Sequence, residues 1–268
     1  MAAKDLPPPP IDQRCGACAH HFRAVPTDRL VHEARARWEQ FSDDELAEAA
    51  RQRGEHTVHT FLVALHERAD RSVFDAALEL INRAGEADRV LGLCILRELG
   101  PCESRPVFPE TWELLEGLAD RETGRVLAWA LRCLGWLHSP RALSTLLRYV
   151  DHSDPLVRFV VADNLLGCAP EGNDPSTLAA LLRLSEDEDP EVRWAALYDI
   201  NEHVTMDTPE LRAVLTRRCA DSSPDVREQA LEALGKRAQR EWPRVAPGPS
   251  RRAGRRTTAG KRPGWRSS

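Results

Sequence analysis

The chain has 268 residues, and it has no apolar run of the roughly 18 to 20 residues that a membrane-spanning helix needs. It also has no glycine-rich phosphate loop, no nucleophile elbow and no metalloprotease helix motif. Its first residues lead from Met1 directly into Pro7–Pro10, without the charged-then-apolar leader of an exported protein. We therefore expect a soluble protein without a membrane span and without a cofactor. A non-enzymatic role is favoured, and an enzymatic one stays open.

The seven cysteines are an odd number and suggest no disulfide framework. Together with the missing leader, they predict a reduced, cytoplasmic location. Cys94 and Cys133 fall inside apolar helical patterns, where thiols act as small buried hydrophobic groups.

Charge is divided unevenly along the chain. The whole chain carries −5, but Pro243–Ser268 has eight basic residues and no acidic one, so residues 1–242 carry about −13. The basic residues of this tail (241–268) include Arg251, Arg252, Arg255, Arg256, Lys261 and Arg262. Its Pro, Gly, Ser and Arg content is typical of disorder. Three roles stay open: an arm for nucleic acid or an acidic protein, a segment that folds back on the acidic body, or a solvated tail without a role.

One motif occurs three times in the sequence, and its prolines lie 35 and then 34 residues apart. The copies are Asp154–Arg158, Asp189–Arg193 and Ser223–Arg227. A fixed period of this length is the signature of a stacked helical-repeat array. Each motif opens a helix that we name helix B, in which Asp189 can cap the first N–H groups while Pro190 fills the first helical position. A Leu-rich helix A precedes each helix B, and both kinds bury one face.

The same period continues upstream, where Gly100 and Gly135 close two weaker copies of helix B. We therefore predict about five helix pairs between residues 70 and 240. A capping box from Ser42 to Glu45 opens the helices of an N-terminal cap. The predicted organisation is a Pro-rich arm over residues 1–41, a helical-repeat domain over residues 42–240 and the basic tail.

The pattern Asp-Pro-x-Val-Arg-x-x-Ala-x-x-x-Leu-Gly resembles bacterial HEAT-like repeats, also called phycobilisome-lyase HEAT-like repeats, over about residues 60–240. This resemblance implies an all-α, right-handed α-solenoid superhelix. It also implies that the motif arginines pair with an Asp of a neighbouring repeat. The implied ladder residues are Arg158, Arg193 and Arg227, with Asp154 and Asp189 as partners and Asp225 as a further candidate.

The N-terminal arm carries a cluster of thiols and imidazoles, formed by Cys15, Cys18, His20 and His21. A Cys-x-x-Cys knuckle can hold two corners of a tetrahedral zinc ion, and a histidine can offer a third. No second pair of this kind follows, so an arm without a ligand is favoured over a zinc site or a redox dithiol.

The helix B positions between the repeated residues are the candidates for binding. Phe159 and Trp194 follow the motif arginine, and a second shared position, one turn later, holds Arg132, Asp163 and Tyr198. Trp129 and Trp136 add aromatic surface nearby. Because helix B lines the concave face of a HEAT superhelix, we expect a scaffold that binds a protein or peptide there, as a monomer. Packing of the same aromatic residues between repeats is the alternative.

Three further functions stay open. The basic tail favours association with nucleic acid. The resemblance also admits a HEAT-like lyase or DNA glycosylase, although the acidic body disfavours the latter because that activity needs a cationic surface for phosphates. The pairs His32-Glu33 and His66-Glu67 resemble half of the iron site of a HEAT-repeat hydroxylase, and solvated polar helix faces explain them more simply.

Overall fold

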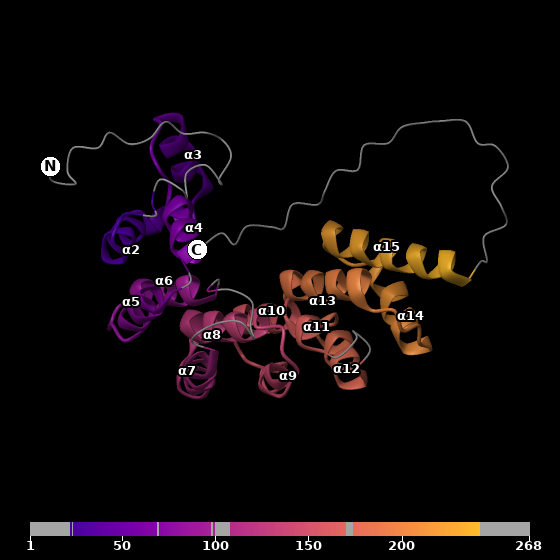
Figure 1. Cartoon of the computed structure of the whole chain (residues 1–268). Coiled ribbons are helices and arrows are strands. Elements are labelled where there is room, and N and C mark those ends of the chain that lie inside the picture. Colours follow the sequence, from indigo (N-terminus) through magenta and orange to yellow (C-terminus); the bar gives the residue numbers. More distant parts are fainter. Residues whose placement is uncertain are drawn as a thin grey trace, which may run out of the picture. The chain divides into compact units, whose positions relative to one another are not determined.

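The computed structural model describes residues 22, 24–68, 70–97, 99, 108–169 and 174–241. Over these ranges the secondary structure is helical and contains no strand. The described helices fall into two compact units, the first ending at His138 and the second beginning at Ser139, and each is described by itself. Figure 1 labels the helices and colours them in the order of the chain.

In its described residues, unit 1 contains seven α-helices and one 3-10 helix. They are α2 (Thr27–Ala36), η1 (Trp38–Phe41), α3 (Asp44–Gln52), α4 (Val58–Arg68), α5 (Arg71–Ile81), α6 (Glu86–Arg97), α7 (Phe108–Arg121) and α8 (Gly124–Trp136). The predicted A/B pairs are present, because α5 packs on α6 and α7 packs on α8. The two helix B members, α6 and α8, also pack against each other and so join the two repeats.

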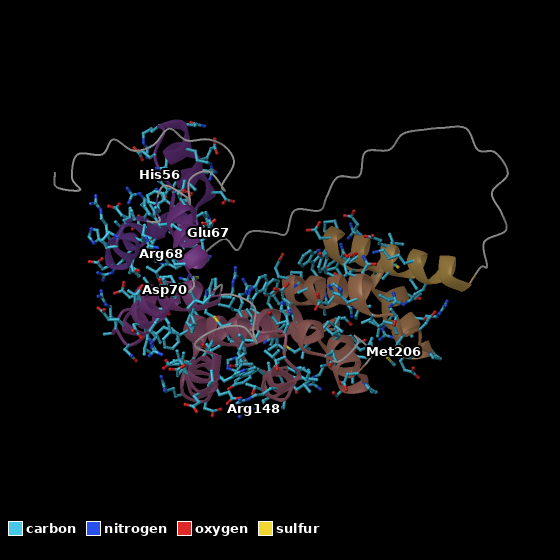
Figure 2. The ribbon with its side chains drawn as sticks, in the orientation of Figure 1. His56, Glu67, Arg68, Asp70, Arg148 and Met206 are labelled. Carbon is cyan, nitrogen blue, oxygen red and sulfur yellow. The ribbon has the colours of Figure 1, made fainter. Side chains whose placement is uncertain are left out.

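Helical structure in unit 1 begins earlier than the sequence suggested. α2 and η1 lie inside residues 1–41, the range assigned to the arm, and α2 packs against α4. Arg68, labelled in Figure 2, donates hydrogen bonds to the backbone oxygens of Phe22 (2.6 Å) and Val25 and to Thr27 Oγ1 (3.0 Å). These bonds hold the start of α2 against the end of α4. The long-range partner is an arginine 41 residues or more away in the chain, so no local pattern could indicate it.

The described part of unit 2 contains seven α-helices. They are α9 (Pro140–Leu147), α10 (Pro155–Ala162), α11 (Leu165–Cys168), α12 (Pro175–Leu184), α13 (Pro190–His203), α14 (Pro209–Arg218) and α15 (Pro224–Glu241). α12 pairs with α13 and α14 pairs with α15, as predicted. The helix B members contact one another in sequence, α10 with α13 and α13 with α15, so the repeats stack in the order of the chain.

Proline and a capping side chain open five helices of unit 2: α9, α10, α12, α13 and α14. Asp189 accepts hydrogen bonds from the N–H groups of Glu191 (2.8 Å) and Val192 (3.4 Å), and Pro190 follows it at the first helical position. Asp154 and Asp174 cap α10 and α12 in the same way. These acceptors satisfy backbone donors that have no partner within the helix. The cap therefore fixes the residue at which each of these helices begins.

Three local predictions differ from the structure. α3 begins one residue later than the capping box implied, because the Asp43 side chain, not Ser42, accepts from the first N–H groups. Helix B of the third pair breaks at Asp163, which ends α10, and continues as α11. The last helix B does not stop at Gly235 but runs on to Glu241.

The core of each unit consists mainly of aliphatic side chains from facing helices, and in unit 1 it also contains Phe61, Phe74 and the fully buried Trp112. Cys94 and Cys133 are buried as predicted. Gly92 marks the closest approach of α5 and α6, since a Cβ built there would lie 2.7 Å from the carbonyl oxygen of Ala77. No helix in the described ranges has both the length and the apolar content that a bilayer crossing requires.

Candidate binding surfaces on the helix B faces

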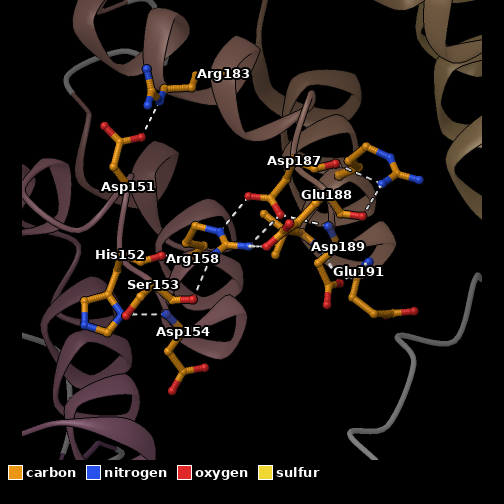
Figure 3. A network of polar contacts seen from close by, with 12 residues as sticks. Asp151, His152, Ser153, Asp154, Arg158, Arg183, Asp187, Glu188, Asp189 and Glu191 are labelled. Atoms are coloured by element: carbon orange, nitrogen blue, oxygen red, sulfur yellow. Dashed lines mark hydrogen bonds and ion pairs between the residues drawn. The ribbon is translucent and has the colours of Figure 1, made fainter.

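The motif arginines connect consecutive repeats of unit 2. Arg158 of α10 donates from Nε and Nη2 to the two carboxylate oxygens of Asp187 at 2.6 and 2.8 Å, and from Nη1 to the backbone oxygens of His152 and Ser153 (Figure 3). Both side chains are about nine-tenths buried. The hydrogen bond with Asp187 is the main reason that the pKa of Arg158 lies above its usual value. One side chain thus ties its own preceding loop to the loop of the next repeat.

The next copy repeats this geometry. Arg193 donates to the two oxygens of Asp221 at 2.7 and 3.0 Å, and to the backbone oxygens of Asp187 and Glu188, both at 2.9 Å. Arg227 makes the equivalent bonds to the backbone oxygens of Asp221 (2.8 Å) and Ser222 (3.0 Å). It has no carboxylate partner among the described residues, in which α15 is the last helix.

The predicted ladder partners require a correction. Asp154 and Asp189 cap their own helices, and the carboxylates that bind the arginines are Asp187 and Asp221, which precede the motif. The reason is the direction of the arginine. The arginine reaches the loop before helix B of the next repeat. In that loop the side chain two residues before the cap residue, Asp187 or Asp221, turns inward and accepts a hydrogen bond from the backbone N–H of the cap residue. Asp225 has no role in the ladder and lies exposed in the first turn of α15.

The predicted residues of unit 1 lie in a cluster on α6, α8 and η1, which we name the aromatic–arginine cluster. Its members are Trp38, Phe41, Arg97, Trp129, Arg132 and Trp136. The guanidinium of Arg132 lies 5.4 Å from the ring centre of Trp129. Arg97 lies 4.9 Å from the ring centre of Trp136 and 6.0 Å from that of Trp129. These distances are within the range of cation–π attraction.

The aromatic rings continue the cluster toward η1. Phe41 lies 5.7 Å from Trp129, and Trp38 stacks on Phe41 at 4.5 Å with the ring planes 14° apart. Trp136 is 42% exposed, whereas Trp129 and Arg132 are half-buried. The cluster is therefore a surface feature, partly immobilised by packing, and not part of the core.

The sequence analysis missed Trp38, Phe41 and Arg97. Arg97 could have been found, because it lies one period of 35 residues before Arg132 and so occupies the same helix B position. Trp38 and Phe41 come from a segment assigned to the arm, which shows no repeat pattern. No local signal connects them to α8.

In unit 2 the predicted residues lie on a second surface, which we name the α10–α13–α15 face. It consists of three equivalent positions on each helix B: Leu156, Phe159 and Asp163; Glu191, Trp194 and Tyr198; Asp225, Glu228 and Glu232. Trp194 and Tyr198 stack with their ring centres 5.3 Å apart and their planes 22° apart, and both are half-buried. Phe159 is only 7% exposed, so it supports the face from below.

Several carboxylates of this face lack a cationic neighbour. Within the described ranges, no Lys, Arg or His nitrogen lies within ion-pair distance of Glu191, Asp225 or Glu228. Burial and the adjacent carboxylates Asp189 and Asp225 raise the pKa of Glu191 above its usual value. The raised pKa indicates a negative local field that no cation of the described residues neutralises.

The other predicted sites receive no support from geometry. Cys15, Cys18, His20 and His21 lie outside the described residues, as does the basic tail from Arg251 to Arg262. Among the residues that the structure does describe, no three His, Cys, Asp or Glu side chains gather as metal ligands would. Glu33, of the first His-Glu pair, forms an ion pair with Arg37 at 2.5 Å.

Comparison with known proteins agrees with this architecture. The structure of YibA from Escherichia coli is similar with a TM-score of 0.58 and 18% identity, over 81% of this chain and 77% of that one. An engineered protein (TM-score 0.48, 15% identity, 85% and 98% coverage) and a designed armadillo repeat protein (0.45, 14%, 83% and 99%) are more distant in structure. No curated protein sequence matches the chain.

The YibA likeness and the all-helical repeats establish an α-solenoid fold. The sequence model of HEAT repeats matches residues 111–198 and 178–247. Together these ranges cover just over half of the chain, including the three copies of the motif. The chain therefore belongs to the HEAT-repeat family.

Proposed function

We propose that the protein is a non-enzymatic scaffold, acting as a monomer, that binds a protein or peptide partner on its helix B faces. The observation that carries this proposal is the aromatic–arginine cluster of unit 1. Its residue types, tryptophan and arginine, are those that contribute most binding energy at protein interfaces. Trp136 is one of the few large apolar side chains exposed in the described part of the chain.

The geometry of the cluster supports binding more than core packing. Arg97 lies against both Trp129 and Trp136, and this contact restricts the arginine before any partner arrives. Less side-chain entropy is then lost on association. The planar guanidinium can stack on a ring while its edge donates hydrogen bonds, so it can accept a carboxylate or a backbone carbonyl of a partner.

The proposal predicts that partner affinity and stability respond separately to substitution. Trp136→Ala and Arg132→Ala in the full chain should each weaken partner binding by about 30-fold, which corresponds to a hot spot of about 2 kcal/mol. The free energy of unfolding should change by about 1 kcal/mol or less for Trp136→Ala, since the ring is 42% exposed. Partners captured by the tagged full chain would be quantified by mass spectrometry and their affinities then measured.

Leu231→Ala provides the matched control. Leu231 is an apolar side chain of α15 that is 59% exposed and lies outside the cluster. Its replacement should leave both binding and stability unchanged. Equal binding by wild type, Trp136→Ala and Arg132→Ala would refute the proposal, and so would a loss of stability large enough to explain the loss of binding.

The composition of the tail favours a second candidate function, association with nucleic acid. Residues 243–268 carry eight basic side chains and no acidic one. Binding through this segment should weaken steeply with salt, because each neutralised phosphate releases counterions. Replacing Arg251, Arg252, Arg255 and Arg256 by Gln in the full chain should abolish the interaction. Salt-independent binding by this variant would exclude it.

A further inference from the structure

The α10–α13–α15 face combines an aromatic platform with three carboxylates, Glu191, Asp225 and Glu228, that have no cationic partner among the described residues. Trp194 and Tyr198 lie stacked at its centre, flanked on α13 by Glu191 and on α15 by Asp225 and Glu228. None of its nine positions carries a basic residue. A ligand that fits this face must therefore bring positive charge, and its aliphatic or aromatic groups can cover the two rings.

The helix dipole does not remove this excess of negative charge. Glu191 and Asp225 lie in the first turns of α13 and α15, where a carboxylate is stabilised by the unpaired N–H groups. Even so, the pKa of Glu191 is raised and not lowered, by burial and by Asp189 and Asp225. Asp189 and Asp225 thus lie close enough to Glu191 to disfavour its charged form, in addition to the effect of burial.

The chain itself carries a segment of matching chemistry. Eight basic residues and Trp265 lie in residues 243–268, directly after the end of α15 at Glu241. At a rise of about 1.5 Å per residue, Glu232 and Asp225 lie about 14 and 24 Å from that end along the helix. The nine residues between Glu241 and Arg251 span up to about 30 Å when extended, so the basic run can reach Asp225 and the neighbouring Glu191.

We propose that the basic C-terminal tail, residues 242–268, is an intramolecular ligand of the α10–α13–α15 face. The arginines pair with Glu191, Asp225 and Glu228, and the hydrophobic parts of the tail cover Trp194 and Tyr198. The tail is covalently joined to the end of α15, and such a linkage gives it an effective concentration of the order of 1 mM near the face, so weak individual contacts suffice. An external basic peptide must displace the tail to bind. This inference does not depend on the proposed function of the cluster in unit 1.

Two measurements on the full chain test the docking. The tail contains several trypsin sites, and a docked tail is protected, so its cleavage rate reports directly on occupancy. Neutralising the face by Glu191→Gln, Asp225→Asn and Glu228→Gln should accelerate tail cleavage by about fivefold or more. Raising the salt from 0.05 to 1 M should do the same in wild type, because screening at 1 M acts over about 3 Å. A synthetic 242–268 peptide corrects for the effect of salt on trypsin.

The matched control removes three exposed carboxylates elsewhere, by Asp28→Asn, Glu113→Gln and Glu210→Gln. It changes the net charge equally and should cleave at the wild-type rate. Circular dichroism would verify that both triple variants fold, as expected for exposed positions. Equal rates in wild type, face variant and control would overturn the proposal.

Zero-length cross-linking locates the contact. A carbodiimide joins a lysine amine to a carboxylate in direct contact, and the chain has only three lysines: Lys4, Lys236 and Lys261. In wild type, Lys261 should link mainly to Glu191, Asp225 or Glu228 within one molecule. Mixing unlabelled and ¹⁵N-labelled protein separates links within a chain from links between chains. Links spread over both units, links only between chains, or no links from Lys261 would each overturn the proposal.

Discussion

Removal of the Asp221 carboxylate should destabilise unit 2 more than any other single change to a polar side chain considered above. Asp221 is 1% exposed in its side chain and accepts from Arg193 (2.7 and 3.0 Å), Arg218 (2.8 Å) and the N–H of Ser223 (3.0 Å). Asp221→Ala leaves the Arg193 guanidinium, whose side chain is 8% exposed, without its carboxylate. Breaking a buried pair in this way costs about 3–5 kcal/mol.

The assay is urea denaturation followed by circular dichroism, with hydrogen exchange to localise the change to α13 and α15. Repeat proteins can lose one end of the stack first, so exchange in α13 is the more specific measurement. Asp225→Ala is the matched control, because Asp225 is exposed and makes no ladder contact; its effect should stay within about 0.5 kcal/mol. In the double variant with Arg193→Met, much of the loss should be recovered, since no buried charge then remains.

The pH dependence gives an independent check. Burial alone would raise the pKa of Asp221, but hydrogen bonds from Arg193, Arg218 and the Ser223 N–H outweigh it and hold the pKa well below its usual value. A carboxylate with a lowered pKa in the folded state stabilises the protein fully above its unfolded pKa of about 3.9 and loses this contribution as the pH falls further. Wild type should thus lose stability below about pH 4 more steeply than Asp221→Ala. A loss of less than about 1 kcal/mol at neutral pH, with no difference in acid, would refute the stabilising role of the ladder.

Three further outcomes follow from the geometry. Gly92→Ala should lower the free energy of unfolding by about 1–3 kcal/mol in urea denaturation, because its Cβ would lie 2.7 Å from a backbone oxygen of α5. Gly235→Ala should raise it by up to about 1 kcal/mol, because no atom lies within 4 Å of the added Cβ. Asp189→Ala should cost about 1 kcal/mol through the lost cap of α13, measured in the same way. Iodoacetamide should leave Cys94 unmodified in the native protein, because burial raises the pKa of its thiol and blocks access of the reagent, whereas half-exposed Cys219 should react. Labelling of Cys94 before unfolding would contradict its place in the core.

The fold was predictable from the sequence because its signals are local. A capping side chain, a proline and an apolar stripe specify where each helix begins and which face it buries, and Asp189 with Pro190 performs this role in the structure as expected. The ladder partners were less accessible. Asp187 and Asp189 differ by only two positions, and the choice between them depends on which side chain the loop turns inward. That direction is a property of the folded loop, which no repeat pattern specifies.

The candidate surfaces show the same division between local and tertiary information. Trp129, Arg132 and Trp136 could be selected on residue type and helical position, and Arg97 by subtracting one period from Arg132. The contact of Phe41 with Trp129 joins residues 88 positions apart and depends on how η1 packs in unit 1. A prediction based on repeats alone cannot include a residue that lies outside the repeats.

The two surfaces have one helix B position in common, the one that Arg132 and Tyr198 occupy. Successive repeats place Arg97 and Arg132 there in unit 1, and Asp163, Tyr198 and Glu232 in unit 2. The position is not used by the core or the ladder, so its side chains can vary without loss of the fold. Its charge changes from positive to negative between the units. Under the two proposals, the position in unit 1 accepts an acidic group and the position in unit 2 a basic one. Reversing the charge of Arg97 and Arg132 together should then abolish binding to unit 1 without increasing exposure of the tail to trypsin, a result that separates the two surfaces experimentally.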